Sequence, residues 1–510
     1  MPAPAPGAAG TRFPGRLAVA GIGSSLLIMI VVSAAGPNRA VVTVPGPGWG
    51  PPWWIPLHLS VAVVTVALWT AVVSGTAGVA AGLVAIRRGA RPPAHLLVIA
   101  ALVVTAVFAV LLPAGSTDSL DYAAYGRMVA IGHDPYVMTP LQLRQAGDPV
   151  GIAAPLPWET KHSVYGPLAT VEQATAAILG GTSAARIAFW LKLWNALAFA
   201  VIVLALDRLV RDDPARRARA HLMWSLNPLL LWGLVAGGHV DAMAAAVGFL
   251  GLALLSPATL GHLRPGQRPS LLAGLAAGAL VGAAADLKIT FILFGLGITW
   301  AARRSPRTLL AAGTGAAAVL VPSYLWFGPP AIAVLVYRDA SATGDNLYQL
   351  FYRPFGVAAM PGLTLLVAPI LVAVIWLLLR RLPEGFAARP AVRPALALSL
   401  AWLLVWPYQR PWYDAMAFCL LALYPASRLD WPMLGRLAAV TIYSVPGMPG
   451  RPRSPWLAAV TRADQILVIP LVRLMALVAV VVLCLSGAWR ARRRGLLGKT
   501  AVRIPSARHY

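Results

Sequence analysis

Apolar runs of about twenty residues recur along the whole chain and constrain its fold more than any other feature. A helix needs about 20 apolar residues to cross roughly 30 Å of hydrocarbon. Only 12% of the residues are charged, whereas soluble domains carry about 25%. A membrane barrel would need alternating apolar and polar positions, which this sequence lacks. We therefore expect an all-α polytopic membrane protein.

The apolar runs predict about fourteen spans, and a bundle of about 12–14 transmembrane helices. The expected spans are residues 17–35, 57–86, 94–113, 186–206, 221–236, 241–257, 270–285, 289–302, 308–326, 357–379, 394–406, 412–424, 433–447 and 466–486. The expected domains are a disordered cytoplasmic tail of residues 1–16, a membrane domain of residues 17–489 and a basic cytoplasmic tail of residues 490–510. The largest loop on the other side of the membrane covers residues 113–183.

The net charge of +25 at first suggests nucleic-acid binding. The basic residues, however, form short clusters between spans, which is typical of residues that set membrane topology. With both termini in the cytoplasm, 28 of the 42 Lys and Arg residues fall on the cytoplasmic side, and 12 of the 17 acidic residues fall on or near the opposite face. We therefore expect an inner-membrane protein with a periplasmic site, and no nucleic-acid partner.

The two cysteines, Cys419 and Cys484, both lie in apolar runs. This placement predicts buried structural thiols rather than a disulfide or metal framework. No second histidine lies at ligand spacing from His239, and the acidic residues form no clustered ligand set. We expect neither a metal nor another cofactor.

The first outer segment after the third span contains two carboxylates three residues apart, Asp118 and Asp121. If this stretch is helical, both lie on one face, and burial at the end of a span favours a general base. Tyr122 accompanies them, and Arg127 is a candidate anion ligand. The alternative is an interfacial helix start, with capping aspartates and tyrosines in the aromatic belt.

Two short turns between apolar stretches also contain ionisable residues. The first places His239 beside Asp241, and the second contains Lys288. Ionisable groups at the membrane are costly and are usually functional. The alternative reading is an Asp241 helix cap with a hydrogen-bonded His239, and an ordinary ion pair at Lys288.

Three outer arginines lie away from any topological cluster: Arg338, Arg353 and Arg410. Arginine binds phosphate well, so these residues are candidates for a lipid-phosphate substrate. Aromatic residues surround Arg410, among them Trp412. They are suited to stacking on a sugar or covering an isoprenoid, although an aromatic belt would have the same composition.

The sequence resembles the actinobacterial polyprenol-phosphate-mannose-dependent α-1,6-mannosyltransferases between about residues 110 and 415. The matching motifs occur in the same order: Asp118, Tyr122 and Gly126, then Gly132–Tyr136, Tyr165–Leu168, Asn227–Pro228, Gly238–Asp241 and the turn at Lys288. The resemblance implies a C-type glycosyltransferase fold that uses lipid-phosphate sugars on the outer face. Val240 departs from the family's usual turn, which leaves the acceptor open.

By this resemblance, Asp118 matches the family's general base, and Asp121 is an additional carboxylate that could share or replace that role. The implied reaction is an inverting displacement in which polyprenyl-phosphate-mannose donates mannose to a glycolipid or glycan hydroxyl. Tyr165, His239 and Asp241 would contact the substrates, and the outer cations would hold the leaving phosphate.

Three alternatives remain open at this stage. A related enzyme with a polyprenyl-phosphate arabinose donor would present the same phosphate and isoprenoid. A lipid-linked sugar transporter would show polar groups in span centres and repeat symmetry. In a membrane scaffold, the outer aspartates would be incidental. The clustering of polar groups at one face favours the enzyme.

Overall fold

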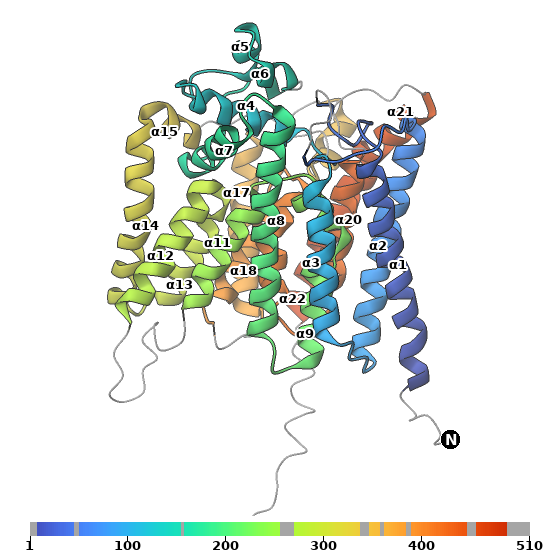
Figure 1. Ribbon diagram of the computed structural model, residues 1–510. Helices are drawn as coiled ribbons and strands as arrows, with labels where there is room; N and C mark the ends of the chain where they lie inside the picture. Colours follow the sequence, from blue (N-terminus) through green and yellow to red (C-terminus); the bar gives the residue numbers. More distant parts are fainter. Residues whose placement is uncertain are drawn as a thin grey trace, which may run out of the picture.

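The computed structural model describes residues 8–44, 50–154, 158–255, 270–336, 346–357, 362–383, 389–445 and 455–486. Helices form nearly all the regular structure of these residues, and most of them run side by side in one bundle (Figure 1). The expectation of an all-α polytopic membrane protein is confirmed. The basic tail predicted at residues 490–510 lies outside the described residues, as does Arg338.

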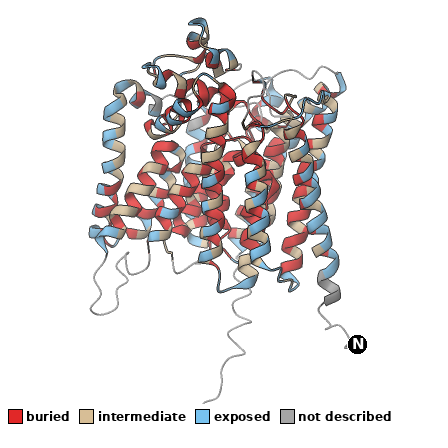
Figure 2. Ribbon diagram, in the orientation of Figure 1, coloured by how far each residue is buried: buried red, intermediate tan, exposed pale blue. Residues whose placement is uncertain are grey.

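Among the described residues, five helical segments are long and apolar enough to cross a membrane. They lie within α1 (Ala8–Ala34), α2 (Val61–Arg87), α8 (Ala184–Leu209), α14 (Pro306–Phe327) and the continuous run of α21 (Pro455–Ala463), η7 (Asp464–Val468) and α22 (Ile469–Ser486). The outer faces of the helices carry exposed apolar side chains. Examples are Trp326 on α14 and Leu365 on α17 (Leu363–Arg381). Figure 2 shows buried residues concentrated towards the inside of the bundle, as expected where the outer surface faces lipid.

The remaining predicted spans coincide with shorter helices. These are α3 (Ala94–Val110), α12 (Leu271–Leu287), η4 (Ile289–Phe291), α13 (Ile292–Ala302), α18 (Val392–Val405), η6 (Pro411–Asp414), α19 (Ala415–Leu421) and α20 (Asp430–Tyr443). A helix of 17 residues such as α3 rises about 26 Å, which is less than the full hydrocarbon thickness. The predicted positions therefore correspond to helices, although not every one is long enough for a full crossing.

The predicted spans 221–236 and 241–257 form one bent unit. It contains α9 (Pro214–Ala220), η2 (His221–Ser225), α10 (Pro228–Leu230), η3 (Leu231–Ala236) and α11 (Asp241–Leu254). The helical direction bends by 113° between Ala236 and Asp241. Gly238 adopts a left-handed φ of +67° at the bend, a conformation that glycine adopts without strain. The break leaves His239 and Val240 in a turn at the start of α11.

The predicted outer loop folds into a helical cap at one end of the bundle, and the N-terminus and α9 lie at the other end (Figure 1). The cap contains α4 (Asp118–Ala130), α5 (Pro140–Gln145), α6 (Pro149–Ala153), η1 (Trp158–Thr160) and α7 (Pro167–Gly180). The stretch that contains Asp118 and Asp121 is helical. Gly126 brings α4 against α7, because a Cβ there would lie 2.0 Å from the Gln173 carbonyl oxygen.

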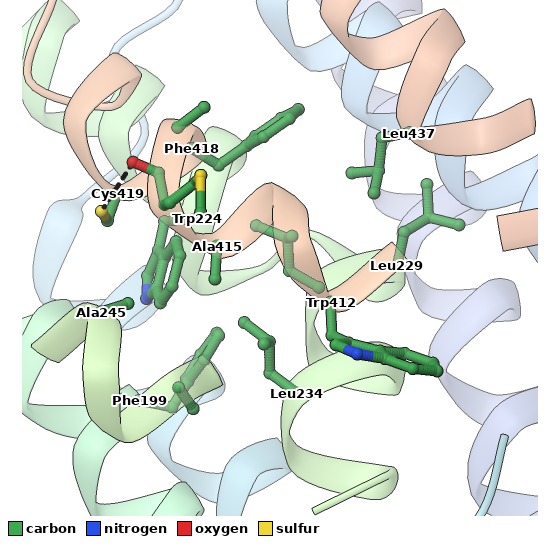
Figure 3. Packing of buried hydrophobic residues seen from close by; sticks show 14 of the residues in the cluster. Phe199, Trp224, Leu229, Leu234, Ala245, Trp412, Ala415, Phe418, Cys419 and Leu437 are labelled. Carbon is green, nitrogen blue, oxygen red and sulfur yellow. Dashed lines mark hydrogen bonds between the residues drawn. The ribbon is translucent and has the colours of Figure 1, made fainter. Parts of the chain in front are cut away.

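The other described helices are α15 (Pro329–Val336), α16 (Gln349–Tyr352) and η5 (Arg353–Phe355). The apolar core lies beneath the cap. Phe199 stacks on Trp224 at a centroid distance of 4.9 Å, and Trp412 belongs to the same buried cluster (Figure 3). Cys419 and Cys484 are buried free thiols, as predicted.

Candidate active site

A close approach between two loops positions the start of α4. After α3 the chain turns at Gly115, whose φ is +85° and whose Cβ, if present, would lie 2.5 Å from the Trp232 indole nitrogen. The neighbouring Ala114 amide donates to the Ala236 carbonyl oxygen at 2.9 Å. These contacts place Asp118, the first residue of α4, beside the turn that carries His239.

Three atoms define the surroundings of the Asp118 carboxylate. Ser116 Oγ donates to Oδ1 at 2.8 Å and accepts from the Asp118 backbone N–H at 3.1 Å. His239 Nε2 lies 3.5 Å from Oδ2. The Asp118 side chain remains 19% exposed, so a substrate hydroxyl can still reach this carboxylate.

The His239 ring is fixed on two sides. Its Nδ1 lies 2.6 Å from the Gly233 carbonyl oxygen, and the ring stacks on Trp412 with centroids 3.6 Å apart and planes 14° apart. Both ring nitrogens therefore face oxygen acceptors, at Gly233 and Asp118.

The two predicted catalytic carboxylates have opposite protonation preferences. Burial raises the pKa of Asp118, but the hydrogen bond and charge of His239, the Ser116 hydroxyl and the charge of Arg410 outweigh burial and leave it below its ordinary value. Burial raises the pKa of Asp121 well above its ordinary value, and the charges of Asp118 and Glu159 raise it further. The surroundings therefore favour the ionised form of Asp118 and the protonated form of Asp121.

The surroundings of Asp121 also differ from those of Asp118. It is 3% exposed, and neither carboxyl oxygen has a hydrogen-bond partner among the described residues. Nearby Glu159 pairs with Arg144 at 2.5 Å and so ties η1 to α5. Asp121 therefore lies under the cap, whereas Asp118 faces the His239 turn.

A buried ion pair lies close to Asp118. Lys288 Nζ donates to both carboxylate oxygens of Asp241, at 2.8 and 2.7 Å, and lies 4.0 Å from the centre of the Tyr413 ring. The charge of Lys288 also acts on Asp118. The two predicted turns, at His239–Asp241 and at Lys288, thus meet in one site.

Tyr122 and Tyr165 close another side of the site. Their hydroxyls lie 2.7 Å apart and their rings meet edge to face. Tyr136 donates to the Tyr165 carbonyl oxygen at 2.9 Å. The charge of Asp118 acts on both Tyr122 and Tyr165, so these phenols lie near the carboxylate.

The predicted arginines are distributed unevenly. Arg410 lies over the rings of Tyr408 and Tyr443, at 4.9 and 5.6 Å from their centres. Arg353 is exposed and is 3.4 Å from the Gln349 side-chain oxygen, with no described contact to the Asp118 group. Arg127 Nε donates to Asp148 at 2.8 Å, so the charge of Arg127 is paired within the cap.

The structure thus brings together one set of predicted residues: Asp118, Tyr122, Tyr165, His239, Asp241, Lys288, Arg410 and Trp412. Within the described ranges, no group of three or more His, Cys, Asp or Glu residues is placed to hold a metal ion. The arrangement offers a partly exposed carboxylate, an imidazole and cations with aromatic walls.

Most of these residues fall inside residues 18–304, which match the family model described as alpha-(1->6)-mannopyranosyltransferase, N-terminal domain. The chain belongs to this mannopyranosyltransferase family. The resemblance drawn from the sequence motifs is confirmed. Arg410 and Trp412 lie beyond the matched residues, so only the structure connects them with the family's region.

Two further proteins are similar to this member of the family. Alpha-(1->6)-mannopyranosyltransferase B of Corynebacterium glutamicum is 28% identical over 148 residues, which cover 28% of this chain and 24% of that protein. The match thus spans about a quarter of the relative. The solved structure of apo ArnT from Cupriavidus metallidurans is 16% identical, covers 74% of this chain and 72% of its own, and gives a TM-score of 0.37.

Sequence reasoning missed three partners of the family site. Ser116 hydrogen-bonds Asp118, the Gly233 carbonyl oxygen orients His239, and Tyr413 lies under Lys288. A serine two residues before a helix-starting aspartate is a local capping signal that could have revealed Ser116. The Gly233 contact depends on the backbone fold and leaves no mark in the sequence.

Proposed function

We propose that this protein transfers a mannosyl residue from polyprenyl-phosphate-mannose to a hydroxyl of a glycolipid or glycan acceptor, with inversion at the anomeric carbon. The observation that carries the proposal is the ionised, partly exposed Asp118 held between Ser116 and His239. Membership of the mannopyranosyltransferase family supports the choice of sugar.

In the proposed reaction, Asp118 accepts the proton of the acceptor hydroxyl as that oxygen attacks the anomeric carbon. The new C–O bond forms while the bond from the anomeric carbon to the phosphate oxygen breaks. The electron pair leaves with the polyprenyl phosphate, whose negative charge needs stabilisation in the transition state. A phosphate leaving group needs no separate general acid, so one ionised carboxylate is sufficient.

Asp118 fits the base better than Asp121 for two reasons. A base must be unprotonated, and only Asp118 has a pKa below its ordinary value. A base must also reach the substrate proton, and Asp121 is almost fully buried. Asp121 is then a neutral group that supports α4 beneath the reacting atoms.

Lys288 and Arg410 are the proposed ligands of the donor phosphate. Asp241 holds Lys288 in place through two hydrogen bonds, and aromatic rings orient both cations. Charge-assisted hydrogen bonds of this kind bind phosphate oxygens strongly. Trp412 and Tyr165 offer flat surfaces for the sugar or the first isoprene units. Arg353 remains a more distant candidate, and Arg338 lies outside the described residues.

The proposed location is the inner membrane with the site facing the periplasm. The clustered arginines of α9 and the N-terminus lie at the end of the bundle opposite the cap (Figure 1). Basic residues favour the cytoplasmic side. The cap and Asp118 would then face the periplasm. A lipid-linked donor would supply the sugar there in place of a soluble nucleotide sugar.

Sugar transfer by the purified protein in lipid vesicles tests this function. Radiolabelled polyprenyl-phosphate-mannose and polyprenyl-phosphate-arabinose would be compared, each with a membrane glycolipid acceptor. We expect transfer from the mannose donor and inverted product stereochemistry. Transfer only from the arabinose donor would overturn the assigned sugar while retaining the reaction class. No transfer from either donor would overturn the enzyme assignment.

A further inference from the structure

A lysine lies buried in the membrane helix α8. Lys192 has 0% of its surface exposed, and apolar residues surround it in the sequence from Ile187 to Leu206. Within the described part of the chain it forms no ion pair with a carboxylate. An ionisable side chain within a membrane helix is costly and therefore calls for a specific role.

The ammonium group of Lys192 binds the end of α3. Its Nζ donates to the carbonyl oxygens of Leu111 and Leu112, at 2.5 and 3.1 Å. Leu111 and Leu112 directly follow Val110, the last residue of α3, so this contact ties α8 to the segment that leaves α3. From there the chain continues through a few residues to Asp118.

The same face of α8 supports the turn that carries His239. A Cβ on Gly238 would lie 2.9 Å from Lys192 Cγ, so the lysine stem packs directly beneath this glycine. One helical turn further along α8, Asn195 Nδ2 lies 3.5 Å from the Gly238 carbonyl oxygen and 2.9 Å from that of Leu191. The methylene stem and the ammonium group of Lys192 therefore touch different loops.

These two loops also contact each other. The Ala114 amide donates to the Ala236 carbonyl oxygen at 2.9 Å. Ala114 lies two residues after Leu112, and Ala236 lies two residues before Gly238. The contacts of Lys192 with Leu111, Leu112 and Gly238 and the hydrogen bond between Ala114 and Ala236 thus join the two loops that lead to Asp118 and His239. A shift of either loop on α8 would change the 3.5 Å separation of these two side chains.

We propose that Lys192 is a positioning residue that holds Asp118 and His239 at contact distance by binding the end of α3 and packing under Gly238. Its effect on sugar transfer rests on the proposed function, whereas its effect on the geometry does not. Neither a shorter polar residue nor an apolar one supplies both contacts, because the stem must pass Gly238 before the charge reaches the carbonyls.

The test compares Lys192→Met, which keeps the stem length without the charge, with Lys192→Gln, which keeps a donor on a shorter stem. Thr65→Val is the control, because Thr65 is buried in α2 and hydrogen-bonds only within its own helix. For each variant, we would measure melting temperature, kcat and KM for the donor. A cryo-electron microscopy structure of Lys192→Met would give the separation of Asp118 and His239.

We expect Lys192→Met to lower kcat at least tenfold with less than a threefold change in donor KM, and to lengthen the separation of Asp118 and His239. Lys192→Gln should retain more activity than Lys192→Met, and Thr65→Val should keep wild-type kcat. A folded Lys192→Met protein with an unchanged separation would overturn the proposal, even if the wild type transferred no sugar. A lowered melting temperature with unchanged kcat would also overturn it.

Discussion

His239 Nε2 lies 3.5 Å from Asp118 Oδ2, and the His239 ring rests on the Trp412 indole at a centroid distance of 3.6 Å. These residues come from α4, the bend before α11 and η6, so the contact joins three distant parts of the sequence. The contact with His239 lowers the pKa of the Asp118 carboxyl, whereas burial raises it. The low pKa of Asp118 therefore depends in part on His239.

Replacing His239 with Gln should move the acid limb of the rate–pH profile to higher pH. The pKa of Asp118 is lowered in the wild type, so its activity is lost only when the pH falls through that lowered value. Without His239, burial raises the pKa of the Asp118 carboxyl. The measurement is kcat/KM between about pH 4 and pH 8. Ser116→Ala, which removes a smaller contribution, should give a smaller shift. An unchanged acid limb in His239→Gln would contradict this dependence.

Asp121→Asn should make the protein more stable at pH 7. The pKa of Asp121 is raised in the folded state, so the unfolded chain loses its proton first as the pH rises above about 4, and folding becomes less favourable. Each pKa unit corresponds to about 1.4 kcal/mol. Asparagine is neutral in both states and avoids this loss, so the gain should disappear towards about pH 4.

Thermal unfolding in detergent at the two pH values measures the gain. Asp118→Asn is the matched control, because the folded-state pKa of Asp118 is lowered. Its ionised form contributes stability above the pKa of the unfolded chain, and this stability is lost as the pH falls through the folded value. Asp118→Asn should therefore be less stable than wild type at pH 7. Equal shifts in the same direction for both variants would contradict the assigned protonation states.

A double substitution separates the structural and chemical roles of Lys288. Lys288→Met leaves Asp241 buried without its cation, which should cost about 3–5 kcal/mol. Adding Asp241→Leu removes the unpaired charge and should restore much of that stability. Sugar transfer should remain lost in both variants, because Lys288 is a proposed phosphate ligand. Recovery of transfer in the double variant would remove Lys288 from that role.

Gly126→Ala should destabilise the cap. Its Cβ would lie 2.0 Å from the Gln173 carbonyl oxygen, so α4 and α7 must separate. Overpacking of this kind costs about 1–3 kcal/mol or more. Gly435→Ala is the control, because nothing lies within 4 Å of the added atom in α20. It should leave stability unchanged or raise it by up to about 1 kcal/mol. Equal melting temperatures for the two variants would contradict the close packing.

The sequence predicted the features that depend on local composition. Apolar runs located the helices, and the order of short motifs led to both Asp118 and the turn at His239. The burial of Cys419 and Cys484 also followed from their apolar surroundings. These features are accessible from the sequence because hydrophobic periodicity and membrane thickness act on each segment separately.

Features that depend on contacts between distant segments were not accessible in the same way. The bend of 113° between the expected spans at 221–236 and 241–257 could not be read from the sequence. Arg127 read as an anion ligand, but the fold of the cap brings Asp148 to it. The sequence left open whether Asp121 shares or replaces the role of Asp118 as the base. Only the position of His239 and the burial of Asp121 distinguish them.

The most direct test of this account is sugar transfer from radiolabelled polyprenyl-phosphate-mannose by Asp118→Asn and Asp121→Asn, each with donor binding measured in parallel. Loss of a general base costs about 10²–10⁴-fold in rate, so we predict a loss of this size in Asp118→Asn with donor binding retained. Asp121→Asn replaces one neutral group with another and should stay within about tenfold of wild type. The reverse pattern, with Asp121→Asn inactive and Asp118→Asn active, would contradict the account.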